Sequence, residues 1–300
     1  MKLVIGSTGF IGRALVKALV ERYPGQVRAL VRQNSKLLEL AQLPGLELVV
    51  GDILDRESLT NAMKGVDTLF YFAALTANIK NKENIYWRIN AEGTYNAIEA
   101  AAQAGVKRLV LCNGLGTIKS TPGSYMRTRW EMEEAARQST IPWTILQPGV
   151  VFGTGSEFFE SQARIIKKAP IAAMIGGSKI RFQPVYVGDV VRAAVEASER
   201  TDKIGKTIEL VGAENYTYKE LIDLILVTIK KKRLKMSVPL WAAWIGATIF
   251  NLLPKPPLTP ALVEMFSFDN VAADPNVIEH EFGFKPSPLI PYLEKHGIRF

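Results

Sequence analysis

The chain has 300 residues, 48% of them hydrophobic, which is ample for the core of one large α/β domain, alone or with a smaller lobe. One cysteine and two histidines argue against a disulfide framework and a structural zinc site, and the lone Cys112 favours a reducing compartment. The net charge of +8 favours polyanionic partners such as phosphorylated cofactors or anionic lipids, whereas no zinc-finger spacing or aromatic-rich RNA-binding pattern supports nucleic acid.

The first half of the chain alternates short apolar strands with helices. Strands are predicted at 2–5, 27–31, 46–50, 67–73, 107–112 and 142–146. Helices are predicted at 10–22, about 35–41, 55–64, 83–104 and 124–138. The alternation predicts right-handed βαβ units and a parallel sheet that is covered on both faces. Because the first strand follows residue 1 with no targeting peptide before it, we expect a cytoplasmic protein.

The second half is less regular. Helices are predicted at 153–168 and 217–231, and a strand at 206–212. Residues 184–199 are interpreted as a strand end and a helix, with Asp189 as the helix cap.

These elements predict an α/β protein with a Rossmann-type doubly wound parallel sheet and a smaller, interleaved C-terminal lobe. Residues 1–155, with 181–213 returning to them, are assigned to the nucleotide-binding core. Residues 156–180 and 214–300 are assigned to the smaller lobe, which would meet a substrate or a partner.

A glycine triplet, Gly6-x-x-Gly9-x-x-Gly12, lies between the first strand and the first helix. Gly6 permits a tight turn, Gly9 lets backbone amides approach a pyrophosphate, and Gly12 lets the helix pack closely on the sheet. The helix N-terminus then presents free N–H groups and a positive dipole to the phosphates. In this strand–turn–helix context, the triplet predicts a dinucleotide site.

The residues after the second strand help to choose the cofactor. NAD sites usually carry a carboxylate there, which binds the ribose hydroxyls. This chain has Arg32 and Lys36 instead, and Arg13 is a third cation that follows the last glycine. We therefore prefer NADP(H), with its 2′-phosphate, and keep NAD(H) as the alternative. Asp52 is placed to bind the adenine amino group, to cap a helix, or to do both.

Beyond these features, the sequence resembles the short-chain dehydrogenase/reductase superfamily, in its extended and atypical branches with epimerase/dehydratase-like members. The matching stretches run in the expected order at 6–12, 51–55, 71–75, 88–110, 124–153 and 183–193. The long C-terminal segment is also similar to the atypical branch related to the NAD(P)-binding accessory subunit of respiratory complex I. The resemblance implies bound NADP(H), a Rossmann core and a small lobe over the nicotinamide end.

The resemblance also implies a catalytic set, from which this chain departs. In active members, a tyrosine acts as general acid/base, a lysine four residues later binds the nicotinamide ribose and favours tyrosinate, and a serine or threonine polarises the substrate carbonyl. Tyr125 and Arg129 keep the spacing that places both on one helical face, but arginine cannot join a proton relay. Asn113 stands at the serine position and is a candidate hydrogen-bond donor to a carbonyl.

The complete predicted cofactor set combines the glycine turn, the cations, the strand ends and the nicotinamide pocket that the resemblance implies. It comprises Gly6, Thr8, Gly9, Phe10, Ile11, Gly12, Arg13, Arg32, Lys36, Asp52, Ile53, Ala73, Ala74, Cys112, Tyr125, Arg129, Pro148 and Val151. Asn90 matches a family asparagine, for which a structural hydrogen bond is at least as good an interpretation as a ligand contact.

A basic run at 230–235 precedes an apolar stretch at 240–253. The stretch is too short for a typical span of about 20 residues and is bracketed by Pro239 and Pro254. The favoured interpretation is a core helix of the small lobe with solvated lysines. The alternatives are a helix that rests on an anionic membrane surface, at its inner face, or one that lines a pocket for a hydrophobic substrate such as a quinone or isoprenoid.

Three functional hypotheses follow. The leading one is an NADP(H)-binding atypical short-chain dehydrogenase/reductase with an altered Tyr125–Arg129 site and weak or modified activity on a hydrophobic small molecule. The second is a non-catalytic nucleotide-binding protein with a structural, assembly or redox-sensing role and a contact with a respiratory complex. The third is an active sugar epimerase or dehydratase. None of them needs a metal.

Overall fold

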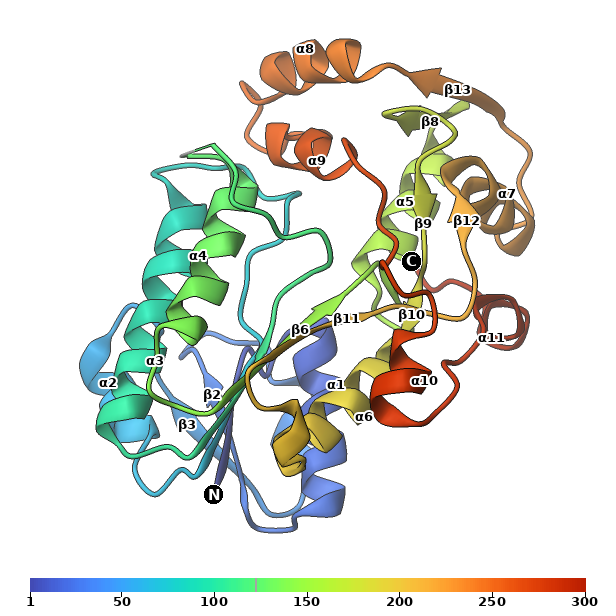
Figure 1. Ribbon diagram of the computed structural model, residues 1–300. Helices are drawn as coiled ribbons and strands as arrows, with labels where there is room; N and C mark the ends of the chain where they lie inside the picture. The colour runs from blue at the N-terminus through green and yellow to red at the C-terminus, as the bar shows by residue number, and fades with distance from the viewer. Residues whose placement is uncertain (122) are drawn as a thin grey trace. The chain divides into compact units, whose positions relative to one another are not determined.

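The computed structural model describes residues 1–121 and 123–300 (Figure 1). The chain forms two compact units. The first comprises Met1–Leu75, Asn81–Gln147 and Val190–Ile208, and the second comprises Thr76–Lys80, Pro148–Asp189 and Glu209–Phe300. Each unit draws on three separate stretches, so the predicted interleaving is confirmed.

The central sheet has seven strands in the order β11-β6-β5-β4-β1-β2-β3. Their bounds are β1 Lys2–Ile5, β2 Val27–Val31, β3 Leu46–Val50, β4 Thr68–Tyr71, β5 Arg108–Cys112, β6 Trp143–Pro148 and β11 Lys206–Leu210. All pairings among β1 to β6 are parallel. The chain reverses its direction of winding between β1 and β4, which is where a Rossmann sheet opens a crevice at the carboxyl ends of its strands. The predicted fold class is confirmed.

Helices cover both faces of this sheet (Figure 1). They are α1 Phe10–Arg22, α2 Arg56–Ala62, α3 Gly93–Gln103, α4 Tyr125–Arg137 and α6 Val187–Glu199. Alternate strand residues such as Leu3, Leu69 and Leu109 share one core with α2, α3 and α4. Because side chains of a strand alternate between faces, both faces of the strands must be apolar, and this explains the near-continuous hydrophobic runs.

Two predicted helices differ from the structure. The helix expected at about 35–41 is wrong, because the segment forms only a short 3₁₀-helix, η1 Leu38–Gln42. Pro44 and Gly45 follow closely and end the segment, so it is too short to offset the free-energy cost of nucleating an α-helix. The helix expected at 83–104 begins instead with a π-helical segment, η2 Trp87–Glu92, which continues into α3.

The π-helical segment is fixed by Asn90, whose side chain is completely buried. Its Oδ1 accepts a hydrogen bond from the Leu75 amide at 2.8 Å, and its Nδ2 donates to Thr128 Oγ1 at 3.2 Å. Thr94 in turn donates to the Asn90 carbonyl at 2.5 Å. Asn90 therefore ties the loop after β4 to η2 and α4, which favours the structural interpretation of this residue.

The second unit contains three two-stranded sheets. They pair β7 Val151–Phe152 with β10 Val185–Tyr186, β9 Arg181–Phe182 with β12 Tyr216–Thr217, and β8 Ile171–Ile175 with β13 Leu234–Val238. Residues 148–155 and 181–189, which the sequence assigned to the core, group with this unit because β7 and β10 pair with each other.

Helices also lie within the second unit. They are α5 Glu157–Lys168, α7 Tyr218–Thr228, α8 Leu240–Phe250, α9 Pro260–Met265, α10 Val277–Phe282 and α11 Leu289–His296. Their shared core includes Phe159, Phe182, Tyr218 and Phe266. Helix α7 starts with a capping box, in which Thr217 and Glu220 bond each other's backbone amides.

Two interpretations of the second half of the sequence are corrected. Asp189 does not cap α6 from outside but lies in its first turn, where its carboxylate accepts from the amide of Ser287 at 2.6 Å. Helix α8 is not a core helix, because only Ala243 and Ala247 of its side chains are buried. The apolar stretch predicted burial on composition, but the outer face of α8 has no protein element over it. No helix among the described residues is long and apolar enough to cross a membrane.

Substitution of the buried Asn90 by alanine is expected to lower the free energy of unfolding by about 1–3 kcal/mol, because the half-buried Leu75 amide loses its acceptor. Urea denaturation followed by circular dichroism measures the change. Gln103→Ala, at the exposed end of α3, is the control and should change stability by less than about 0.5 kcal/mol. Equal effects of the two variants would contradict the anchoring role of Asn90.

Cys112 should be unreactive in the native protein. Burial at the end of β5 raises the pKa of its thiol to about 12. At about pH 8 the thiolate fraction is then lower than that of an ordinary cysteine by roughly three orders of magnitude, and alkylation slows accordingly. Labelling with a chromogenic disulfide reagent should detect no thiol until denaturant is added, and then one per chain. Rapid labelling of the native protein would contradict this placement.

Candidate functional site

The glycine-rich turn after β1 forms part of the wall of a cavity of about 360 Å³ in the first unit. Gly6 has a φ of +87°, and a Cβ atom there would lie 2.4 Å from the Phe72 carbonyl carbon. A Cβ at Gly12 would lie 2.1 Å from the Gly6 carbonyl oxygen. Gly9 is the N-cap of α1, whose first turn carries no acidic side chain. The first amides of α1 have no intrahelical acceptor and are therefore donors for an anion.

Beyond the end of β2, the cavity wall includes Arg32 and Ser35. The Arg32 amide donates to Ser35 Oγ at 3.1 Å, and the Ser35 amide donates to the Arg32 carbonyl at 2.9 Å. This turn brings an exposed guanidinium and a hydroxyl to the place where a carboxylate would bind ribose hydroxyls. Both groups can donate hydrogen bonds to phosphate oxygens.

The cavity wall continues past the end of β3 with Asp52. Its Oδ1 accepts from the Leu54 amide at 2.9 Å, which fixes the carboxylate within the turn. The helix cap that was one interpretation of Asp52 is instead Asp55, which accepts from the amides of Glu57 and Ser58. Asp52 therefore presents an acceptor to the cavity without serving as the N-cap of α2.

Eight residues of the predicted cofactor set line this cavity: Gly6, Thr8, Gly9, Arg32, Asp52, Ile53, Ala73 and Ala74. Five others lie outside its lining, namely Phe10, Ile11, Gly12 and Arg13 at the start of α1 and the exposed Lys36 after β2. Cys112 ends β5, and Tyr125 and Arg129 lie on α4. Pro148 and Val151 belong to the second unit, where Pro148 ends β6 and Val151 begins β7.

Sequence analysis missed several residues of the cavity wall: Ile5, Leu30, Ser35, Gly51, Phe72, Leu75, Ile85 and Ile89. Most of them lie at the carboxyl ends of β1 to β4, where a signal existed, because this edge of a doubly wound sheet binds ligands. Ile85 and Ile89 gave no usable signal. Ile85 precedes the π-helical segment and Ile89 lies within it, and that irregularity does not follow from hydrophobic periodicity.

Tyr125 and Arg129 contact each other directly on α4. Arg129 Nη1 donates to the Tyr125 hydroxyl at 2.8 Å, and that hydroxyl donates to the Leu75 carbonyl at 3.1 Å. Leu75 also lines the cavity, so the tyrosine borders it. Arg129 Nε donates to Asn113 Oδ1 at 2.8 Å. The guanidinium is thus held from two sides by the other two predicted catalytic residues.

The backbone leaves room for this guanidinium at Gly114. A Cβ atom there would lie 2.2 Å from Arg129 Nη2 and 2.8 Å from Cζ. Any other residue would displace the arginine or shift the loop after β5. The "NGLG" sequence at 113–116 therefore compensates for the bulk of an arginine at a position where the resemblance leads one to expect lysine.

A buried carboxylate, which sequence analysis missed, orients Asn113. Glu133 is completely buried, and its Oε1 accepts from Asn113 Nδ2 and from Gln147 Nε2, each at 2.7 Å. Its Oε2 accepts from Arg137 Nη2 at 2.6 Å. Because the Glu133 carboxylate accepts a hydrogen bond from the amide nitrogen of Asn113, the amide oxygen of Asn113 must face Arg129. The i, i+4 spacing of Arg129, Glu133 and Arg137 was a signal for this chain of contacts.

This arrangement limits what the site can do chemically. The amide hydrogens of Asn113 are directed at Glu133 Oε1, Thr117 Oγ1 and the Arg129 carbonyl, not at a substrate. The Tyr125 hydroxyl directs its proton at the Leu75 carbonyl, and the hydroxyl oxygen accepts a hydrogen bond from Arg129. The Arg129 guanidinium does not release a proton at ordinary pH. Tyr125 can still donate to a substrate oxygen if it leaves Leu75, but Arg129 cannot pass a proton back to it.

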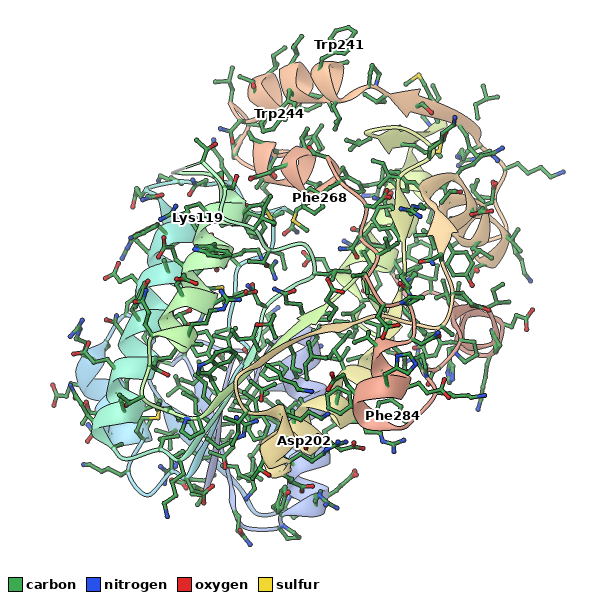
Figure 2. The ribbon with its side chains drawn as sticks, in the orientation of Figure 1. Lys119, Asp202, Trp241, Trp244, Phe268 and Phe284 are labelled. Carbon is green, nitrogen blue, oxygen red and sulfur yellow. The ribbon has the colours of Figure 1, made fainter. Side chains whose placement is uncertain are left out.

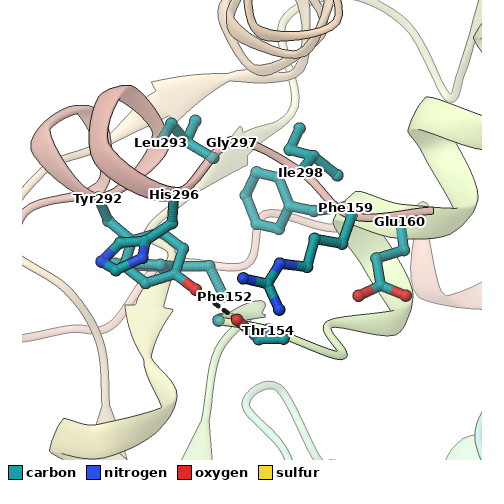
Figure 3. A pocket seen from close by; sticks show the side chains of 11 residues that line it. Phe152, Thr154, Phe159, Glu160, Tyr292, Leu293, His296, Gly297 and Ile298 are labelled. Carbon is teal, nitrogen blue, oxygen red and sulfur yellow. Dashed lines mark hydrogen bonds between the residues drawn. The ribbon is translucent and has the colours of Figure 1, made fainter.

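The second unit has a cavity of about 20 Å³ bordered by Phe152, Phe159 and His296, where the Tyr292 hydroxyl lies 3.2 Å from Thr154 Oγ1 (Figure 3). That volume holds about one water molecule and no substrate. Among residues 1–121 and 123–300, no group of three or more His, Cys, Asp or Glu side chains is arranged to hold a metal ion.

Comparison with protein-family models matches residues 6–168 to a family described as NAD(P)H-binding. Among curated proteins, the mitochondrial NADH dehydrogenase [ubiquinone] 1 alpha subcomplex subunit 9 of Arabidopsis thaliana is 25% identical and aligns over 99% of this chain and 76% of its own. The sterol-4-alpha-carboxylate 3-dehydrogenase, decarboxylating, of Mus musculus is 24% identical over 83% of this chain and 74% of its own.

Solved structures show the same fold. The Citrobacter sp. triphenylmethane reductase complexed with NADP(H) has a TM-score of 0.77 at 22% identity, with 98% of this chain and 99% of that chain covered. An NADPH-dependent quinone oxidoreductase of Escherichia coli complexed with NADPH has a TM-score of 0.75 at 21% identity, with the same coverage.

The family match covers more than half of the chain, and it begins at the first glycine of the turn that forms the cavity wall. The sheet order, the glycine cradle and the tyrosine on α4 agree with it. The chain belongs to the NAD(P)H-binding family and, within it, to the atypical and extended short-chain dehydrogenases/reductases.

Proposed function

We propose that the protein binds NADP(H) and is a reductase with an altered Tyr–Arg site, which acts weakly or in a modified way on a hydrophobic small molecule. The observation that carries the proposal is the position of Arg129. Its guanidinium donates to both Tyr125 and Asn113, so the residues expected to act on a substrate are bonded to one another.

The preference for NADP(H) over NAD(H) rests on the turn after β2. Arg32 and Ser35 line the cavity, and the residues from 32 to 36 include no carboxylate that would repel a phosphate. A guanidinium that meets a phosphate forms charge-assisted hydrogen bonds, about twice as strong as neutral ones. The glycine cradle and the acid-free start of α1 suit the pyrophosphate of either cofactor. The residues present therefore fit a dinucleotide and favour the phosphorylated one.

When bound, NADPH would be the source of hydride, and the proton would come from the protein. Tyr125 is the proton donor, because its hydroxyl lies beside the cavity at Leu75. Arg129 donates a hydrogen bond to the Tyr125 hydroxyl and so holds that oxygen in place. Tyr125 must regain its proton from solvent, because the arginine guanidinium stays protonated and cannot donate one. Asn113, oriented by Glu133, positions Arg129 and does not polarise the substrate.

The hydrophobic character of the proposed substrate is supported by the names of several relatives. They include a sterol-4-alpha-carboxylate dehydrogenase, an epimerase of an undecaprenol-linked sugar and, among structural neighbours, a quinone oxidoreductase. The cavity wall also includes the apolar Ile85, which precedes η2, and Ile89, which lies within it.

A non-catalytic role in holding the nucleotide is the second candidate. It is favoured by the mutual bonding of Tyr125, Arg129 and Asn113, which leaves the nucleotide cavity intact, and by similarity to subunit 9 of the mitochondrial NADH dehydrogenase. In that case the protein would contact a respiratory complex as a structural, assembly or redox-sensing component.

Arg32→Ala is expected to weaken NADPH binding by about 10- to 100-fold and to change NADH binding by less than about 3-fold, because only NADPH carries the 2′-phosphate. Fluorescence titration of the purified protein with each nucleotide measures both constants. Lys107→Ala removes an exposed cation that precedes β5 and serves as the control. An equal loss of affinity for NADH and NADPH would contradict the assignment of Arg32 to the 2′-phosphate.

Arg129→Lys tests whether the arginine limits turnover. A lysine would restore a group that can relay protons, and we expect NADPH oxidation with a panel of quinones and aldehydes to rise by about 10-fold or more. The increase should vanish in the Arg129→Lys/Tyr125→Phe double variant. Arg127→Lys, on the same helix and paired with Glu131, is the matched control and should show no increase.

An Arg129→Lys variant that still binds NADPH but gains no activity would contradict the altered-reductase proposal and support the non-catalytic one. Loss of NADPH binding in this variant would instead identify Arg129 as a nucleotide ligand. Fluorescence titration of the same preparations separates these outcomes.

A further inference from the structure

The outer face of α8 is apolar and exposed in the second unit. The exposed fractions are 69% for Trp241, 56% for Ile245, 59% for Ile249 and 84% for Leu252. The opposite face packs Ala243 and Ala247 against α9 through Val263. Figure 2 shows Trp241 on the side of α8 that faces away from α9. A surface helix normally turns charged or polar residues outward, and α8 does the reverse.

The apolar surface extends beyond the helix. Trp244, Phe250 and Leu253 are partly or largely exposed, and Leu234 and Met236 on β13 are exposed by 77% and 49%. Strand β13 leads directly into α8 (Figure 1). Several exposed, large apolar side chains on neighbouring segments mark a site of interaction.

The sequence stretch that contains this apolar surface is strongly basic. The sequence contains no acidic residue between Asp223 and Glu264, and the same stretch carries Lys230, Lys231, Lys232, Arg233, Lys235 and Lys255. Lys235 is paired with Asp223, and Arg233 donates to the carbonyls of Ile166 and Ala169. In the described part of the chain, no ion pair engages Lys230, Lys231 or Lys232, which border a broad surface hollow.

The length of α8 determines how it can meet a lipid phase. Its 11 residues span about 16 Å, roughly half of a hydrocarbon core of about 30 Å. Tryptophans are enriched at the boundary between headgroups and hydrocarbon, and a helix with exposed Trp and Ile residues next to lysines suits that boundary. The helix is thus suited to lie in the interface and not to span it.

We infer that α8 and the basic segment Lys230–Lys235 form a docking surface for an anionic lipid bilayer, with Trp241, Ile245 and Ile249 inserted at the headgroup boundary and the lysines against lipid phosphates. A second copy of the chain is a poorer occupant. In a symmetric dimer each patch meets its equivalent, so the basic segments would lie close together and repel. Anionic headgroups complement the same charges. This surface is independent of the nucleotide site.

Vesicle flotation of the full-length protein tests the inference. Wild type should float with vesicles of phosphatidylcholine and phosphatidylglycerol and remain at the bottom with phosphatidylcholine alone. Trp241→Ser/Ile245→Ser should lower partitioning by about 10-fold or more. Lys230→Gln/Lys231→Gln/Lys232→Gln should lower it by about 100-fold, and added salt should do the same for wild type.

Trp87→Ser and Lys64→Gln/Lys107→Gln, which alter exposed residues of the first unit, are the matched controls and should leave flotation unchanged. If the wild-type protein does not float with anionic vesicles, that result alone overturns the inference, and no variant is needed. Equal flotation with neutral vesicles overturns the role of the lysines. A third outcome is that wild type does not bind vesicles but forms a dimer, and that Trp241→Ser/Ile245→Ser abolishes this dimer. That result would assign the patch to a second copy of the chain and overturn the inference of bilayer binding.

Discussion

A buried carboxylate organises the part of the first unit that contains Tyr125 and Arg129. Glu133 has no exposed surface, and a charge in that position would cost several kcal/mol without partners. It receives hydrogen bonds from Asn113, Gln147 and Arg137, which come from the end of β5, the end of β6 and the next turn of α4. The carboxylate therefore joins two strand ends to one helix, and it determines which atom of the Asn113 amide is left for Arg129.

From this contact the arrangement of the candidate site follows. Asn113 presents its oxygen to Arg129 Nε, Arg129 extends over Gly114, and Arg129 Nη1 donates to the hydroxyl of Tyr125. These hydrogen bonds join the three side chains to one another. A reductase with lysine at this position would keep a relay for protons, whereas arginine provides charge and geometry alone. Leu75 joins this network to the cavity beside the glycine turn, because it lines the cavity and its carbonyl accepts from Tyr125.

Much of the fold was predictable, because it depends on patterns that are local in the sequence. The strands at 2–5 and 27–31 and the helix at 10–22 have the predicted bounds, since apolar periodicity and the glycine turn determine them. The pair Tyr125 and Arg129 was predictable from i, i+4 spacing. Glu133 and Ser35 were not recognised, because their roles depend on which strand ends meet. The outer face of α8 was misassigned because composition shows that a helix is apolar but not whether protein covers it.

The central claim is that the cavity beside the glycine turn holds NADP(H), while Tyr125, Arg129 and Asn113 are joined to one another by hydrogen bonds. The most direct measurement is the identity of the nucleotide released when the freshly purified protein is denatured, together with its rate of exchange before denaturation. The account predicts NADP(H), released slowly, and tighter rebinding of NADPH than of NADH. A protein that carries NAD(H) in preference, or that binds neither nucleotide on titration, would contradict it.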